Sequence, residues 1–365
     1  MYVYYFNAIS AVIYRLIFPG KKNDKMFLFV VCLQMFIILS IRADTFGADA
    51  LAYIRMYDIA KGFSLRDILE NWSFFQVFPL LPYAESGYVF MNWICTQLGL
   101  SYHAYIMILA FVDCYCMYIF LREFSYSPLL GTLMFQTATL SWIFILRRTM
   151  AMNFVFLSFI ALKKKQYLRS VILLIIAVTM HRIAFAFIFY PLLSRIKITK
   201  RLFRIAIIVF IAGTVFSAVD VELVYIIFDS LGKGGYINFN SGFTGLRLAG
   251  LILTTIAFWG IYVSVDFKQF ETPENSVLGA MLFIVILYLT VLATASGLGN
   301  IVVWFILFTF ILATNIVVGY KDRTTRVVLW TAAFMFILFW TYRWIDGLSQ
   351  SVWGQGVIRF MTVWD

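Results

Sequence analysis

Long apolar runs recur from one end of this 365-residue chain to the other, and they restrict the folds open to it. Hydrophobic residues make up 63% of the sequence and charged residues only 13%, so a water-soluble domain of this length would lack the polar side chains that cover a core. Many runs approach the roughly 20 residues with which a helix crosses a bilayer. The sequence therefore predicts an all-α polytopic integral membrane protein, with residues 1–365 in one domain.

Twelve apolar segments are the candidate membrane spans. They lie at 2–18, 25–41, 103–121, 128–146, 149–162, 168–180, 183–194, 202–218, 246–265, 276–295, 301–319 and 327–342. The fifth, sixth and seventh are short for a bilayer, and such short or broken helices are typical of segments that line a cavity inside a membrane protein. We expect residues 168–194 to form a hairpin with Met180, His181 and Arg182 at its outer apex.

The basic residues give the expected orientation of these segments. Clusters of Lys and Arg lie at 21–25, 163–169, 195–204 and 320–326. Cytoplasmic loops carry such an excess, which accounts for the net charge of +11 without nucleic-acid binding. The run 88–100 would invert every later segment if it crossed the membrane, so we expect a re-entrant or interfacial helix there. The outer loops are then 42–102 and 219–245.

Ionisable side chains from four separate parts of the chain gather on the predicted outer side. They are Arg42, Asp44, Asp49, Glu85, Arg147, Arg148, His181 and Arg182. A charged side chain at membrane depth costs roughly 2.5–3.5 kcal/mol, so such groups are usually paired and functional. The pattern therefore predicts one charged pocket that opens away from the cytoplasm.

Each of these residues also has a purely structural explanation. Asp49 would be favoured at the start of a helix by the helix dipole, and Glu85 could cap a helix. The Arg147–Arg148 pair could form an ion pair with one of the acids, and His181 could be a hydrogen-bonded packing residue. Because guanidinium groups match phosphate oxygens, the adjacent arginines nevertheless favour a ligand that carries phosphate.

Other polar and aromatic side chains lie near the predicted pocket. We interpret His103 as an interfacial residue at an outer helix end. Aromatic residues that suit stacking against sugar rings are Trp72, Phe74, Phe75, Tyr83 and Tyr88.

Four short motifs resemble, in order and spacing, those of the EpsG-type polysaccharide polymerases, the Wzy polymerases of capsule, exopolysaccharide and O-antigen assembly. They are RADTFGADALAY, YAESGYVF, LRRTMA and MHRIAFAF, within residues 40–195. The resemblance assigns family roles to Arg42, Gly47, Asp49, Tyr53, Glu85, Gly87, Arg147 and His181. The chain departs from the family pattern at Arg148, where Gln is usual, and at Ile183, where Ser is usual. The family pattern also has an arginine near the antepenultimate helix. This chain has no clear counterpart of it and offers Asn300 in that region.

The resemblance implies a glycosyltransferase in the bacterial cytoplasmic membrane, with a GT-C-like fold and an active site facing the periplasm or cell exterior. It would join undecaprenyl-pyrophosphate-linked oligosaccharide repeats by moving a growing chain onto a sugar hydroxyl of another repeat. The implied partners are the lipid-linked donor and acceptor, membrane lipids and a chain-length regulator.

This chemistry needs cations for the developing pyrophosphate charge and a carboxylate for the proton of the acceptor hydroxyl. We expect Arg147 to bind the pyrophosphate, Asp49 or Glu85 to act as base or acceptor-sugar ligand, and His181 to contact phosphate or transfer a proton. The expected substrate-binding residues are Arg42, Asp44, Tyr53, Arg148 and Arg182. No cofactor is required, because fixed guanidinium charge can replace a metal, although Asp44 and Asp49 leave a divalent metal open.

Three other functions are consistent with a chain of this kind. Many spans with buried charges are also typical of a transporter or flippase of lipid-linked oligosaccharide, although no internal pseudo-symmetry is visible. An O-antigen ligase-like glycosyltransferase would use the same lipid-linked substrate. A membrane acyltransferase would depend almost wholly on His181.

Overall fold

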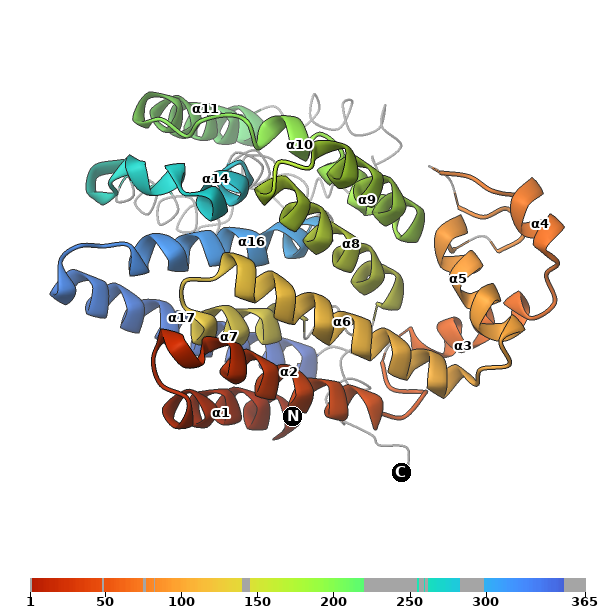
Figure 1. Cartoon of the computed structure of the whole chain (residues 1–365). Helices are drawn as coiled ribbons and strands as arrows, with labels where there is room; N and C mark the ends of the chain where they lie inside the picture. Colours follow the sequence, from red (N-terminus) through yellow and green to blue (C-terminus); the bar gives the residue numbers. More distant parts are fainter. Residues whose placement is uncertain are drawn as a thin grey trace. The chain divides into compact units, whose positions relative to one another are not determined.

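The structure is a computed structural model that describes residues 2–47, 49–74, 77–81, 83–139, 145–219, 255, 259, 262–282 and 299–350 (Figure 1). In these ranges every regular element is a helix. Val77 and Glu85 form an isolated antiparallel β-bridge, which does not extend into a strand. The predicted all-α class is therefore confirmed for the described part of the chain.

The chain forms two compact units, which are described separately. The first comprises Met1–Pro191 and Val327–Asp365, and the second Leu192–Arg326. Helices of the first unit are α1 (Tyr2–Ile17), η1 (Lys21–Asn23), α2 (Asp24–Ser40), α3 (Ala50–Ala60), α4 (Leu65–Glu70), α5 (Ser86–Gln97), α6 (Tyr102–Phe124), α7 (Pro128–Thr139), α8 (Leu146–Lys163), α9 (Tyr167–Met180), η2 (Arg182–Phe187) and most of α17 (Arg323–Gln350). The short α10 (Tyr190–Leu193) lies at the division. The second unit contains α11 (Lys200–Val219), η4 (Phe267–Glu271), α14 (Pro273–Gly279) and α16 (Gly299–Val318).

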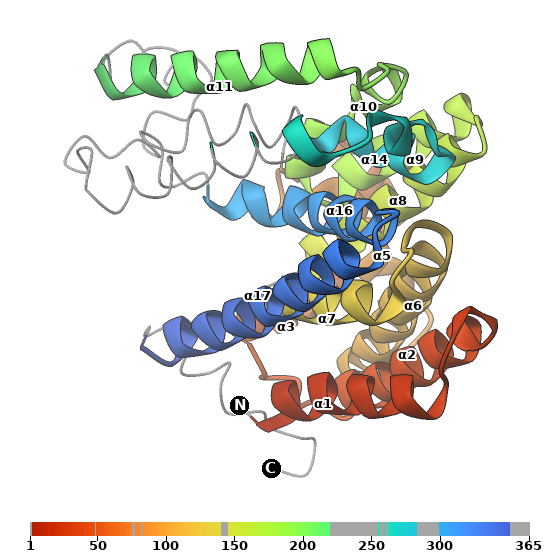
Figure 2. The same cartoon turned by 90° about the vertical axis from the view of Figure 1, so that its left-hand side faces the viewer.

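The interior of the first unit is built by α2, α6, α8 and α9, which pack side by side (Figures 1 and 2). The stacked rings of Phe120 and Phe156 join α6 to α8, with their centroids 4.6 Å apart. Buried Ser158 and Ser170 join α8 to α9 through hydroxyl oxygens 2.7 Å apart. Because helices in a membrane associate through close packing and interhelical hydrogen bonds, these contacts hold the elements that carry the charged motifs.

A second layer of the first unit contains the short helices α3 and α5, which pack against each other. Tyr57 of α3 stacks on Tyr105 of α6 with ring centroids 5.1 Å apart, and its hydroxyl donates to the Leu100 carbonyl over 2.9 Å. Trp93 of α5 donates its indole N–H to the Phe63 carbonyl over 2.9 Å. These contacts fix the segment that the sequence places in the outer loop.

The helices match many predicted spans, but not all of them. Among the residues that the structure describes, two helices, Lys21–Ser40 and Tyr102–Phe124, are long and apolar enough to cross a membrane. Shorter apolar helices are Tyr5–Ile17, Tyr167–Met180, Arg182–Leu193 and Leu307–Val318. The number of twelve spans stays a prediction, and the segments 246–265 and 276–295 lie largely outside the described residues.

One predicted boundary is wrong around the two arginines. We expected spans at 128–146 and 149–162, with Arg147 and Arg148 between them, whereas α8 already begins at Leu146; α7 is described up to Thr139, and residues 140–144 lie outside the described residues. The α8 helix has 18 residues and includes both arginines in its first turn. In the hydropathy pattern Arg147 and Arg148 interrupt an apolar run. Leu and Arg are nevertheless good helix formers, and α8 starts at Leu146, before both arginines.

The predicted apolar span 183–194 lies in the helical segment Arg182–Leu193, but it is not one continuous α-helix. It consists of the 3₁₀ helix η2 and the four-residue α10. Pro191 lacks the backbone N–H that a helix continuing through this position would need. By contrast, the short helix expected at 88–100 is present as the 12-residue α5, which is followed by Gly99 in the left-handed region at φ +70°.

Candidate functional site

Glu85 lies at the centre of a buried ionic cluster in the first unit. It occupies the N-cap position of α5 but makes no side-chain cap hydrogen bond, and it is 3% exposed. Its carboxylate accepts a hydrogen bond from Arg147 Nη1 over 2.7 Å and from the Arg182 backbone N–H over 3.1 Å. His181 Nδ1 lies 3.3 Å from Glu85 Oε1. Three of the four predicted motifs therefore meet at one carboxylate.

A glycine lets these motifs come together. A Cβ on Gly87 would lie 2.3 Å from Thr179 Oγ1 and 2.9 Å from the Thr179 carbonyl oxygen, both far inside van der Waals contact. Gly87 follows Glu85 by two residues, and Thr179 precedes His181 by two. The absence of a side chain at Gly87 therefore brings α5 close to the end of α9, and with it Glu85 to His181.

The protonation states follow from burial and from these neighbours. Burial raises the pKa of the Glu85 carboxyl, but the hydrogen bond and charge of His181, the charge of Arg147 and the Arg182 N–H outweigh it and lower that pKa to about 2. Burial is the main cause that lowers the pKa of His181; the hydrogen bond and charge of Glu85 oppose it, and the charges of Arg147 and Arg148 add to it. At neutral pH Glu85 is ionised and His181 is neutral. Nδ1 of His181 donates to Glu85 in the tautomer that carries a proton there, and in the other tautomer it accepts the Ile183 N–H, 3.5 Å away.

The two adjacent arginines have different surroundings. Arg147 is paired with Glu85, and its guanidinium lies beside the Tyr53 hydroxyl. Arg148 is only 4% exposed, yet in the described ranges it makes no ion pair, and its Nε has no hydrogen-bond partner. Successive helical residues point about 100° apart, so neighbours in sequence reach different partners. Arg148 is therefore a buried positive charge that makes no close ion pair with a described side chain, and the charge of Asp49 acts on it only from beyond ion-pair distance.

Tyr53 and Asp49 complete the side of the site formed by α3. Tyr53 is buried with its ring edge-on to Tyr88, at a centroid separation of 5.9 Å. Burial raises the pKa of the Tyr53 hydroxyl, against the influence of Arg147. Asp49 is the exposed N-cap residue of α3, and its charge acts on both Tyr53 and Arg148. Asp49 thus lies near the arginines while its carboxylate stays accessible.

The remaining predicted ligands take other positions. Asp44 pairs with His103, with Oδ1 and Nδ1 2.7 Å apart, so it lies against the start of α6 rather than on Glu85. Arg42 is buried after α2, and its charge acts on Tyr102 of α6. The Arg182 side chain is exposed, and its contribution to Glu85 comes from the backbone.

A second buried polar contact was not predicted. Asp113, near the middle of α6, accepts a hydrogen bond from Asn153 of α8. Both side chains line a cavity of about 20 Å³ between α2, α6, α7 and α8, about enough for one water molecule. A lone acid in the middle of an apolar run was the signal that could have pointed to this contact.

The aromatic side chains proposed for sugar stacking differ in accessibility. Tyr83 is 76% exposed and Phe74 is also exposed, whereas Tyr88 is fully buried and cannot stack against a ligand. Trp72 is half-buried, with its ring edge-on to Phe74 at 5.9 Å. Phe75 lies outside the described residues. Ser73 donates its backbone N–H to Ser86 Oγ over 2.9 Å, which ties this aromatic segment to the residue after Glu85.

Guanidinium groups distinguish the first turn of α8 in this cluster. Within the ranges that the structure describes, no three His, Cys, Asp or Glu side chains group closely enough to hold a metal ion. The first turn of α8 instead presents two guanidinium groups, of which only Arg147 is neutralised by a carboxylate. A helix N-terminus adds partial positive charge, so this end of α8 suits a phosphate group.

Comparison with known proteins agrees with the motifs. The EpsG family model matches residues 25–353, which is most of the chain and includes every residue of the cluster. No curated protein and no solved structure matches the chain. The chain therefore belongs to the EpsG family, the EpsG-type polysaccharide polymerases.

Proposed function

We propose that this protein joins undecaprenyl-pyrophosphate-linked oligosaccharide repeats at the outer face of the bacterial cytoplasmic membrane. EpsG family membership supports the coarser function, a polymerase of polysaccharide biosynthesis. The observation that carries the finer proposal is the buried Arg148, which makes no ion pair with a described carboxylate, beside Arg147 in the first turn of α8.

An anionic ligand would relieve an unfavourable arrangement at Arg148. An uncompensated charge away from water costs several kcal/mol, and a diphosphate would supply the missing negative charge. Arg147 has one Nη on Glu85, and its other N–H groups remain for the same ligand. The two guanidinium groups therefore form the pyrophosphate site, with Arg148 supplying a charge that no described carboxylate pairs with at ion-pair distance.

The carboxylates divide between two roles. Glu85 is a poor general base, because its low pKa of about 2 leaves it little affinity for a proton, and it already accepts three contacts. Its role is to orient Arg147 and His181. Asp49 is exposed near Arg148 and is the better candidate for the base or the acceptor-sugar ligand.

In the proposed reaction the acceptor hydroxyl oxygen attacks the anomeric carbon of the donor sugar. The bond from that carbon to the pyrophosphate oxygen breaks, and the hydroxyl proton passes to Asp49. Undecaprenyl pyrophosphate leaves with the bonding electrons, and Arg147 and Arg148 stabilise its negative charge. His181 contacts a phosphate oxygen only when its Nε2 carries a proton, because an unprotonated ring nitrogen cannot donate a hydrogen bond.

A deletion strain tests the function itself. Without a polymerase, lipid-linked single repeats accumulate at the outer face and long polymer is lost. Loss of a flippase would instead leave the repeats at the inner face, and loss of a ligase would leave long polymer on the lipid carrier. Restoration of polymer by the wild-type chain but not by Arg147→Ala, at equal membrane levels, supports the proposal. Normal polymer in the deletion strain contradicts it.

A further inference from the structure

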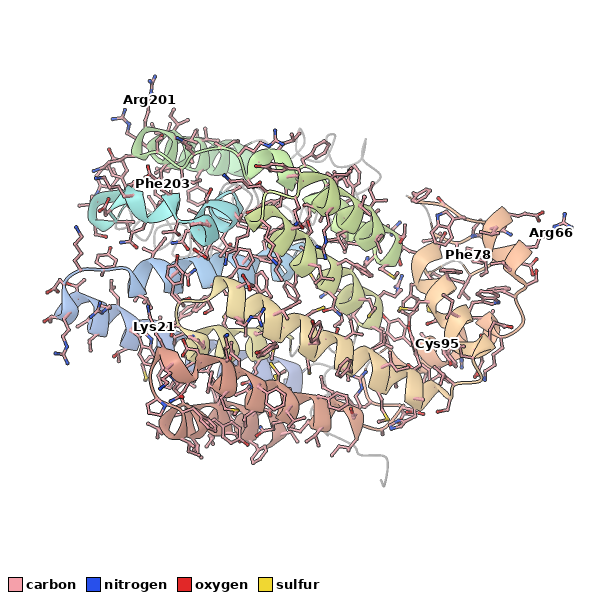
Figure 3. All side chains as sticks on the ribbon, in the orientation of Figure 1. Lys21, Arg66, Phe78, Cys95, Arg201 and Phe203 are labelled. Carbon is pink, nitrogen blue, oxygen red and sulfur yellow. The ribbon has the colours of Figure 1, made fainter. Side chains whose placement is uncertain are left out.

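The start of α11 in the second unit carries a dense group of cations that the polymerase site does not use. Lys197, Lys200, Arg201 and Arg204 are all exposed, and none forms an ion pair with a described carboxylate. Figure 3 shows Arg201 extending away from the α11 ribbon, whereas Phe203 lies on the side of α14. The cations therefore project from a packed helix rather than from an unattached loop.

Packing on the opposite face fixes their direction. Phe203 is fully buried with its ring edge-on to Phe267 of η4, at a centroid separation of 5.7 Å. Buried Ile198 lies so close to α14 that a Cβ on Gly279 would be 2.9 Å from its Cγ1. These contacts hold one face of the segment against the second unit.

The exposed face of α11 changes from cationic to apolar within two turns. Ile205, Ile208 and Ile211 are exposed, with 59% of Ile208 accessible. With 3.6 residues per turn, Ile208 and Ile211 lie on the same side of the helix as Lys200 and Arg204. A helix face that is basic at its start and then exposes isoleucines is typical of a helix entering a bilayer, with its cations at headgroup level.

An aromatic pair beside Lys200 also indicates that this part of the unit lies at the level of the lipid headgroups. The Lys200 ammonium lies 4.8 Å from the centre of the Tyr262 ring, and Tyr262 packs against Trp259 with centroids 5.4 Å apart. Trp259 is 58% exposed. Trp and Tyr gather where hydrocarbon meets headgroups, so this pair marks the boundary independently of the cations.

A second basic segment lies at the same end of the second unit. The Tyr320 hydroxyl donates to Ser264 Oγ over 2.9 Å, which places the turn after α16 beside the segment that leads to η4. Lys268 and Lys321 in these two segments are both exposed. The basic clusters at 195–204 and 320–326, which the sequence assigns to one side of the membrane, therefore meet at one end of this unit.

We propose that Lys200, Arg201 and Arg204 form a binding site for anionic phospholipid headgroups, separate from the polymerase site. Basic clusters next to a membrane helix attract anionic lipids, because each Lys or Arg near the surface adds to the attraction. The phosphate of such a lipid meets the cations, while its acyl chains lie along Ile205, Ile208 and Ile211. Three charges correspond to a preference for anionic over zwitterionic lipid on the order of 10- to 100-fold.

The test compares lipids and matched variants of the purified full chain. In neutral detergent, phosphatidylglycerol should raise the melting temperature by several degrees, and phosphatidylcholine or inorganic phosphate should not. The triple variant Lys200→Gln, Arg201→Gln, Arg204→Gln should lose most of this rise. The control Lys164→Gln, Lys165→Gln, Arg169→Gln removes three exposed cations from the first unit and should keep it.

A second measurement does not depend on the folding of a variant. A photoactivatable phosphatidylglycerol should label peptides from residues 195–211 of the wild-type chain, and excess phosphatidylglycerol should compete more strongly than phosphatidylcholine. Equal loss of the thermal rise in both triple variants, an equal rise with phosphatidylcholine, or labelling spread evenly over all basic loops would overturn the proposal.

Discussion

The Glu85 carboxylate and the Arg147 guanidinium lie 2.7 Å apart, although 62 residues separate them in the sequence. Both side chains are largely buried, so removing one charge leaves the other without compensation. Glu85→Gln should lower the free energy of unfolding by about 3 kcal/mol and abolish polymer formation. Thermal unfolding in detergent measures the first effect. The control Glu70→Gln breaks an exposed pair with Arg66 and should cost less than about 1 kcal/mol. Equal stability of the two variants would contradict this role of Glu85.

Gly87→Ala tests the close approach of α5 and α9. The new methyl group would overlap Thr179, so the two helices must separate, and we expect a loss of about 1–3 kcal/mol together with a large loss of activity. Gly62→Ala is the matched control, because its nearest contact would be a carbonyl oxygen at an ordinary 3.5 Å. If Gly87→Ala keeps wild-type stability and activity, the spacing of Glu85 and His181 does not depend on this glycine.

Acid should destabilise the protein in two stages. The pKa of Glu85 is lower in the folded protein, about 2 against 4.5, so its contribution of about 3 kcal/mol is complete above pH 4.5 and is lost as the pH falls toward 2. The folded-state pKa of His181 is also lowered, so its protonation below about pH 6.5 opposes folding. Melting temperatures measured from pH 8 to about pH 2.5 should fall first below pH 6.5 and again below pH 4.5.

His181→Asn isolates the first stage of this acid response. The amide cannot titrate, so the decrease between pH 6.5 and pH 5 should be smaller than in the wild-type chain, while the later loss through Glu85 remains. An unchanged decrease in His181→Asn would show that another group causes it.

The Asp44–His103 pair predicts that substitutions of these two residues have coupled, rather than additive, effects on activity. Because both side chains are partly exposed, their interaction should be worth about 1 kcal/mol or less. Asp44→Asn and His103→Asn should have similar effects on activity, and the double variant should be no worse than either one, if Asp44 acts by positioning its loop through His103. Additive losses would indicate instead that Asp44 contacts the substrate directly.

Hydropathy and motif order predicted a large part of this structure. The apolar runs predicted helices such as α2, α6 and α16, because an apolar helix satisfies its own backbone in a membrane. The motifs predicted that Glu85, Arg147 and His181 belong together, and the structure brings them into contact. Their catalytic roles stay a prediction.

Other features depend on tertiary contacts that no local pattern encodes. Arg147 and Arg148 look equivalent in sequence, but they point in different directions on α8, and only Arg147 meets a carboxylate. His103 gave no signal of its contact with Asp44, which lies 59 residues away. The close approach at Gly87 likewise depends on where α9 ends.

Substitution of Arg148 separates charge from hydrogen bonding. Gln can still donate a hydrogen bond to a phosphate oxygen, but it carries no charge. A charge-assisted hydrogen bond contributes about 1.4 kcal/mol more binding free energy than a neutral one, which corresponds to a tenfold difference in affinity. Arg148→Gln should therefore raise the KM for the lipid-linked donor about tenfold, and Arg148→Ala should raise it further. Initial rates at increasing donor concentration measure both. A KM equal to that of the wild-type chain in Arg148→Ala would remove Arg148 from the pyrophosphate site.

Polymerisation by the purified chain with a defined undecaprenyl-pyrophosphate-linked repeat tests the central claim most directly. The wild-type chain should form long products and release one undecaprenyl pyrophosphate for each new linkage. The double variant Arg147→Ala, Arg148→Ala, compared at equal amounts of folded protein, should form neither product. Long polymer made by that folded variant at the wild-type rate would contradict the account.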